Sequence, residues 1–157
     1  MPPITAYAQQ TDCGRRRQKN EDSLLICEPE PKLKNKKGFL FAVADGLGGL
    51  AHGEVASRSA VSYIETCYRA QKSLKAETWL EKNIQGANAE IYAQNKQVNE
   101  HEMMATTLTV SYFFKNYIFI GHVGDCRCYR IRNVSIACLS RDHSIARHVL
   151  SRTIGGS

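Results

Sequence analysis

Several acidic residues lie where apolar segments of the sequence are interrupted by small or polar residues. Asp45 directly follows the apolar run 39–44, and a glycine follows it in turn. Carboxylate and backbone carbonyl oxygens are the ligands that small hard cations such as Mg²⁺ and Mn²⁺ prefer. Glycine also lets the backbone come close to an ion. The candidates for a divalent-metal site are Glu21, Asp22, Asp45, Gly46 and Asp125.

An ordinary turn or bulge is the alternative at each of these positions, because Asp and Gly are common in both. Arg17 lies four residues before Glu21, within the basic run 15–19. A guanidinium beside a carboxylate-bound metal pair would suit phosphate, which arginine binds through two hydrogen bonds. The alternative for Arg17 is a solvated surface side chain.

The elements that must position these residues follow from the periodicity of the apolar side chains. Apolar residues recur every three or four positions over 51–71 and 75–97, which predicts two one-faced helices. The run 38–44 is apolar on both parities, so we expect a strand covered on both faces. Other predicted strands are 4–11, 23–27, and two hairpins, 107–113 with 117–123 and 126–132 with 134–139. Strands, then helices, then strands indicate an α+β fold with antiparallel sheets.

Length and composition restrict the class of protein. The 157 residues predict a single domain over 1–157, and 43% hydrophobic with 23% charged residues excludes a disordered chain. No apolar run reaches the roughly 18 residues of a membrane helix, and the N-terminus lacks a signal-peptide pattern, so a soluble cytoplasmic protein without a membrane partner is expected. The six cysteines include no CxxC pair and are expected to be free thiols.

The net charge of +6 raises the possibility of nucleic-acid binding. Basic residues interleaved with aromatic ones, a zinc pattern and a helix-turn-helix pattern are all missing from the sequence, however. We therefore expect no nucleic-acid partner.

Five short motifs occur in a fixed order and together resemble the PP2C (PPM) family of metal-dependent serine/threonine protein phosphatases, most closely its bacterial branch. They match R-x-x-N-x-D, D-G-x-G-G, the G-T-T strand, V-G-D-S-R and L-T-x-D-H-S. In this sequence the motifs are 17–22, 45–49, 105–107, 123–127 and 139–144. The resemblance implies two stacked antiparallel sheets flanked by helix pairs, with metal ions in a cleft at one end of this β-sandwich.

The resemblance also implies an activity and a role for each matching residue. Two Mn²⁺ or Mg²⁺ ions would activate a water that hydrolyses phosphoserine or phosphothreonine in proteins, the substrates of a Ser/Thr kinase. By position, Asp45 would bridge the metals and Gly46 would offer its carbonyl. Glu21 and Asp22 would act through metal-bound waters, Arg17 would bind the substrate phosphate, and Asp125 would serve a third metal site.

The sequence departs from the family pattern in several places. Leu47 stands where animal members carry a histidine, and His52 is expected to begin a helix rather than to replace it. The segment 148–155 resembles L-T-R-A-[IL]-G, but the S-D-G and D-N motifs that complete the metal site are missing. The chain is thus expected to be a C-terminally truncated phosphatase domain. The alternative is a non-catalytic pseudophosphatase that binds phosphoproteins.

Overall fold

The computed structural model describes residues 6–15, 17–33, 36–47, 52–70 and 75–143. Within these ranges the chain forms strands, then two helices, then strands, as the periodicity predicts. The elements are β1 (Asp22–Cys27), β2 (Phe39–Asp45), α1 (Gly53–Ala70), α2 (Ala76–Asn95), β3 (Leu108–Phe114), β4 (Tyr117–Val123), β5 (Tyr129–Arg132) and β6 (Ser135–Cys138), with short 3-10 turns at Pro31–Leu33 and Glu100–Glu102.

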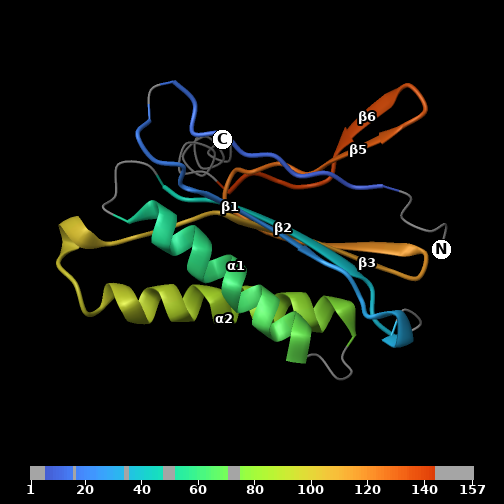
Figure 1. Cartoon of the computed structure of the whole chain (residues 1–157), viewed down its shortest axis with the longest axis horizontal. Helices are drawn as coiled ribbons and strands as arrows, with labels where there is room; N and C mark the ends of the chain where they lie inside the picture. Colours follow the sequence, from blue (N-terminus) through green and yellow to red (C-terminus); the bar gives the residue numbers. More distant parts are fainter. Residues whose placement is uncertain (1–5, 16, 34–35, 48–51, 71–74, 144–157) are drawn as a thin grey trace, which may run out of the picture.

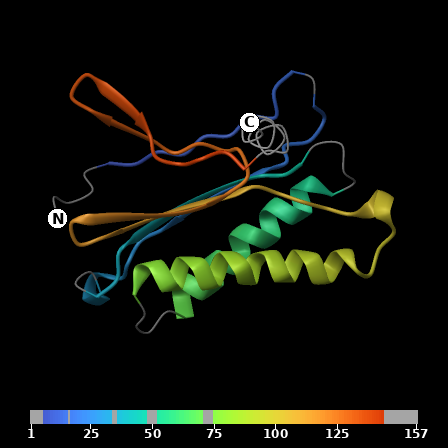
Figure 2. The ribbon, with the colours of Figure 1, turned by 180° about the vertical axis from the view of Figure 1, so that it is seen from behind.

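A four-stranded antiparallel sheet in the order β1-β2-β3-β4 forms the middle layer of the fold. Helices α1 and α2 cover one face of this sheet (Figure 1). The β5–β6 hairpin lies on the other side, as the reverse view in Figure 2 also shows. The predicted antiparallel α+β arrangement is confirmed.

The helices cover the sheet because their apolar residues lie on one side. In α1, Ala60, Ile64 and Tyr68 recur at intervals of four and are at most 3% exposed, and in α2 Trp79 and Leu80 are similarly buried. They pack on the alternate side chains of the strands, which point to one face of a sheet. The sheet contributes Leu25, Leu40, Ala42, Ala44, Leu108, Val110 and Tyr112 to this core. Neither helix in the described residues is long and apolar enough to cross a membrane.

Both predicted hairpins are confirmed, and their turns use residues with positive φ. Lys115 has φ 53° between β3 and β4, and Asn133 has φ 54° between β5 and β6. Two-residue hairpin turns favour this left-handed region because it matches the twist of the flanking strands. The prediction that His52 begins a helix is also confirmed. The His52 carbonyl accepts hydrogen bonds from the amides of Val55 and Ala56, each at 3.1 Å, in the first turn of α1.

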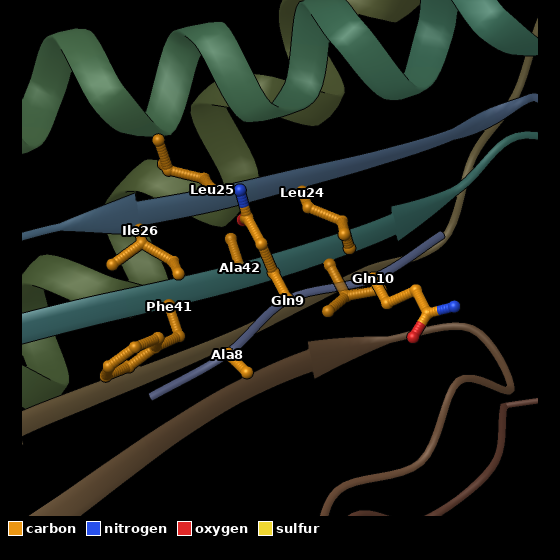
Figure 3. Close-up of a pocket in the computed structure, with 9 residues that line it drawn as sticks. Ala8, Gln9, Gln10, Leu24, Leu25, Ile26, Phe41 and Ala42 are labelled. Atoms are coloured by element: carbon orange, nitrogen blue, oxygen red, sulfur yellow. The ribbon is translucent and has the colours of Figure 1, made fainter. Parts of the chain in front are cut away.

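Two expectations about the first strands are wrong. The predicted strand 4–11 is not formed over its described part, 6–11, where no strand pairs with it. Instead Ala8, Gln9 and Gln10 cross the face of β1 and β2 that the helices leave open, over a hollow of about 250 Å³ (Figure 3). Strand β2 is also not covered on both faces, because Val43 is 42% exposed.

Some residues that carry sequence predictions lie outside the described residues. They include Gly48 and Gly49 of the D-G-x-G-G match, Ser144 at the end of the 139–144 motif, and the whole 148–155 segment.

Candidate metal centre

Two of the candidate carboxylates, those of Asp22 and Asp45, lie opposite each other on neighbouring strands. Asp22 opens β1 and Asp45 ends β2, and the antiparallel register pairs them directly. Directly opposed residues have Cβ atoms roughly 4.5–5.5 Å apart, and like charges at such positions are destabilising. A pair that costs stability at the end of a sheet is more easily explained by a cation-binding role than by packing.

The pKa of Asp45 responds to the other charged candidates around it. The pKa of Asp45 is raised, first by partial burial and then by Asp22, with a further contribution from Asp125. Arg17 acts in the opposite direction and lowers the pKa of Asp45. Two strand ends, the loop after β4 and the basic run before β1 therefore bring their charged residues to one end of the sheet.

Two threonines directly before β3, Thr106 and Thr107, hold the main chain of Asp45. The Asp45 amide donates to Thr107 Oγ1 at 3.0 Å, and the Asp45 carbonyl accepts from the Thr107 amide at 2.9 Å and from Thr106 Oγ1 at 3.0 Å. Thr107 Oγ1 also lies 3.1 Å from Cys126 Sγ. One side chain thus links the strand that carries Asp45 to the loop that carries Asp125.

Gly46 is required by close approach to the backbone around it. A Cβ atom at this position would lie 2.2 Å from the Gly53 carbonyl oxygen and 2.7 Å from that of Glu21. The Gly46 amide also donates to the Glu21 carbonyl at 3.0 Å. The first turn of α1 is therefore packed against the carboxylate end of the sheet.

Asp125 lies in the loop that follows β4, and its neighbours fix the path of the backbone. Gly124 has φ +105°, and a Cβ atom there would lie 2.6 Å from Thr107 Cγ2, so only glycine fits. Burial is the main cause that raises the pKa of the Cys126 thiol, and Asp45 and Asp125 raise it further. These effects favour the protonated thiol, whose Sγ lies within hydrogen-bonding distance of Thr107 Oγ1.

Glu21 and Arg17 form an ion pair beside this cluster. Arg17 Nη1 lies 3.3 Å from Glu21 Oε2, and the exposed fractions of the two side chains are 55% and 15%. Lys19 reaches α1 and pairs with Glu54 at 3.1 Å. The exposed guanidinium can accept a further anionic partner.

The donor set fits a hard cation but is incomplete in the described part of the chain. The salt bridges of the described residues engage Glu21, Glu54, Glu65 and Asp142, which leaves Asp22, Asp45 and Asp125 outside any ion pair. Within the same residues, no group of three or more His, Cys, Asp or Glu side chains is arranged to hold a metal ion. The geometry therefore supplies oxygen ligands without a complete metal shell.

Two further residues support Asp22 and were not predicted as site residues. Thr11 Oγ1 donates to Asp22 Oδ2 at 2.9 Å, and the Asn20 side chain accepts from the Asp22 amide at 3.0 Å. Asn20 belongs to the first motif and could have been selected on that ground. Thr11 could not, because its contact depends on how the N-terminal segment crosses the sheet.

Comparisons with known proteins identify the family of this chain. The family described as Protein phosphatase 2C matches residues 9–153. The chain is 35% identical over 147 residues to the serine/threonine phosphatase stp of Listeria innocua, covering 91% of this chain and 56% of the relative. The Mycobacterium tuberculosis phosphatase PstP is 29% identical over 92% of this chain and 26% of its own length.

Solved structures of related phosphatases show the same fold. Stp1 from Staphylococcus aureus superposes with a TM-score of 0.80 at 32% identity, over 94% of this chain and 57% of that one. The PstP catalytic domain in complex with two manganese ions has a TM-score of 0.72 at 28% identity, over 92% and 58% of the two chains. The chain thus spans little more than half of these structures, and it belongs to the protein phosphatase 2C family.

Proposed function

We propose that this chain carries the N-terminal part of the active site of a metal-dependent protein serine/threonine phosphatase. The observation that carries the proposal is the facing pair Asp22 and Asp45, with Asp125 close enough to raise the pKa of Asp45 further. Names of the relatives support the reaction, since they are serine/threonine phosphatases. The proposed substrates are phosphoserine and phosphothreonine proteins that a Ser/Thr kinase has modified.

The proposed metal ligands are the Asp45 carboxylate, the Gly46 carbonyl and the Asp125 carboxylate, the last at a separate third site. Glu21 and Asp22 would hydrogen-bond to metal-bound water molecules. These donors are all oxygens, which suits Mn²⁺ or Mg²⁺. When bound, such cations acidify and orient a water molecule and neutralise charge on a transferring phosphoryl group.

Arg17 is the proposed phosphate-binding residue. Its guanidinium is 55% exposed, is bonded to Glu21, and is close enough to Asp45 to lower the pKa of that carboxyl. The ion pair with Glu21 restricts the guanidinium before substrate arrives, so less side-chain entropy is lost on binding. Leu47 beside the site is apolar and 48% exposed, so it offers no proton donor.

One observation favours a second function, binding of phosphoproteins without turnover. Among the described residues, no group of three or more His, Cys, Asp or Glu side chains is placed so that it could hold a metal ion. Arg17 and the carboxylates could then recognise a phosphorylated segment through a loosely held cation.

A single domain over 1–157 and a cytoplasmic location stay predictions.

A chimera separates the two functions. This chain would replace the matching part of the Listeria innocua phosphatase, of which it covers 56%. We expect hydrolysis of a phosphothreonine peptide that depends on Mn²⁺ and stops with EDTA. Folding of the chimera is checked by thermal unfolding.

Variants of the chimera assign the roles. Asp45→Asn should abolish turnover, whereas Arg17→Ala should mainly raise KM, because it removes binding that ground and transition states share. Glu81→Gln, on the exposed side of α2, is the control and should leave both unchanged. A folded chimera that binds phosphopeptide without turnover would support the second function, and turnover independent of metal would refute the first.

A further inference from the structure

A short segment after β6 is bonded to the loop that carries Asp125. The His143 amide donates to the Gly124 carbonyl at 2.7 Å, and the Cys128 amide donates to Ser140 Oγ at 3.0 Å. Between these two bonds, the Asp142 carboxylate accepts from the Arg127 guanidinium. The His143 ring also stacks on His122, with centroids 5.5 Å apart. The segment 140–143 is therefore docked along the whole loop 124–128.

The Arg127–Asp142 pair is the most directed of these contacts. Arg127 Nε lies 3.0 Å from Asp142 Oδ1 and Arg127 Nη2 lies 2.6 Å from Asp142 Oδ2, so the two planar groups meet fork to fork. The Asp142 side chain is only 17% exposed, whereas that of Arg127 is 53% exposed. The carboxylate is held by the fold, and it determines where the longer arginine side chain lies.

Arg127 follows Asp125 by two residues in this loop. Cys126 Sγ lies 3.1 Å from Thr107 Oγ1 and Cys128 Sγ lies 3.8 Å from Ser111 Oγ, so the two cysteines on either side of Arg127 are anchored toward β3 and the residues just before it. The Arg127 side chain itself is 53% exposed. Because an arginine side chain is long and flexible, a guanidinium released from Asp142 could reach Asp125.

We propose that Asp142 is a positioning residue that holds the Arg127 guanidinium away from the acidic cluster, so that Asp125 stays available to a divalent cation. This inference rests on the proposed function, because it assumes that the cluster binds metal. An arginine two residues from Asp125 would otherwise neutralise the charge that attracts the cation and occupy its oxygens. The sequence places Asp142 in the 139–144 motif, but the role proposed for it rests on its ion pair with Arg127.

The test measures Mn²⁺ affinity of the 157-residue chain by following free Mn²⁺ with electron paramagnetic resonance. Asp142→Ala should weaken Mn²⁺ binding by about tenfold, the lower end of what loss of an outer-shell partner costs. The double variant Asp142→Ala with Arg127→Ala should return close to the wild-type affinity, because no guanidinium is left to compete. Arg127→Ala alone should bind Mn²⁺ at least as well as the wild type.

The control is Glu65→Ala, which removes an ion pair of the same 2.6 Å separation on α1 and should not change the affinity. If Asp142→Ala unfolds the chain, Asp142→Asn keeps the shape and tests the same charge. A double variant as weak as Asp142→Ala, or unchanged binding in both Asp142 variants, would overturn the inference alone. Wild-type binding no stronger than that of Asp45→Asn would instead overturn the proposed metal site, and this inference with it.

Discussion

The two faces of the four-stranded sheet are covered to very different degrees. On the helix face, Leu40, Ala44 and Val110 are fully buried beneath α1 and α2. On the opposite face, an open groove of about 730 Å³ runs between the sheet and the β5–β6 hairpin. In that hairpin Ile131 and Ile136 are 72% and 69% exposed. One face is a packed core, whereas over the other face the described residues place only the hairpin and the N-terminal segment.

The candidate metal centre lies where these two differently packed regions meet. Asp22 and Asp45 are carried by strands that the helices hold from one side. Asp125 and the segment 140–143 belong to the chain that leads into and out of the hairpin. The first pair should therefore be rigid because of the core, whereas the position of Asp125 depends on local hydrogen bonds.

Ile64→Ala should produce the largest effect. Ile64 is fully buried between α1 and the sheet, and removing three carbons from such a site costs about 2–5 kcal/mol of unfolding free energy. Ile131→Ala on the opposite face is the matched control, expected within about 0.5 kcal/mol of the wild type. Urea unfolding followed by circular dichroism measures both. Similar losses for the two variants would mean that the hairpin face is as well packed as the helix face.

Gly46→Ala should have an intermediate effect, of about 1–3 kcal/mol, because the new methyl group would overlap backbone that cannot move independently. The atoms in the way are the carbonyls of Gly53 and Glu21. Gly121→Ala in β4 is the control, because its Cβ would meet the flexible end of Ile84 at 2.3 Å. Thermal unfolding should show the larger loss for Gly46→Ala. The reverse order would contradict the close packing of α1 against the carboxylate end.

Asp45→Asn should have the smallest effect on stability, with an unusual sign. The pKa of Asp45 is raised in the folded state, so the folded chain binds more protons than the unfolded chain just above the ordinary pKa of 3.8. Stability contributed by this group therefore falls as pH rises through that window. Without metal, Asp45→Asn should be more stable than the wild type at pH 7 by a few tenths of a kcal/mol, given solvent screening.

This gain should disappear near pH 3, where the wild-type carboxyl is protonated as well. Urea unfolding at both pH values in the presence of EDTA makes the comparison, and Glu81→Gln serves as an exposed control. Destabilisation of Asp45→Asn at pH 7 would show that the carboxylate makes favourable contacts within the chain and that the cluster is not strained.

The local pattern of the sequence determined the elements and the positions of the acids within them. The spacing of Ala60, Ile64 and Tyr68 is enough to predict a helix, because helical periodicity is a property of a short segment. Polar pairs between apolar runs predict both hairpins for the same reason. The order of five motifs identified the family, which the match over 9–153 confirms.

The tertiary structure decided everything that depends on a partner distant in sequence. Residues 6–11 carry a strand-like pattern, but a strand needs a neighbour for its hydrogen bonds, and in the described chain this segment has none. The pairing of Asp22 with Asp45 follows from strand register, and that of Arg127 with Asp142 from docking of one loop on another. The sequence alone identifies these residues as candidates. The distances between them are set only when the strands pair and the loops dock, because each contact joins segments that no local propensity connects.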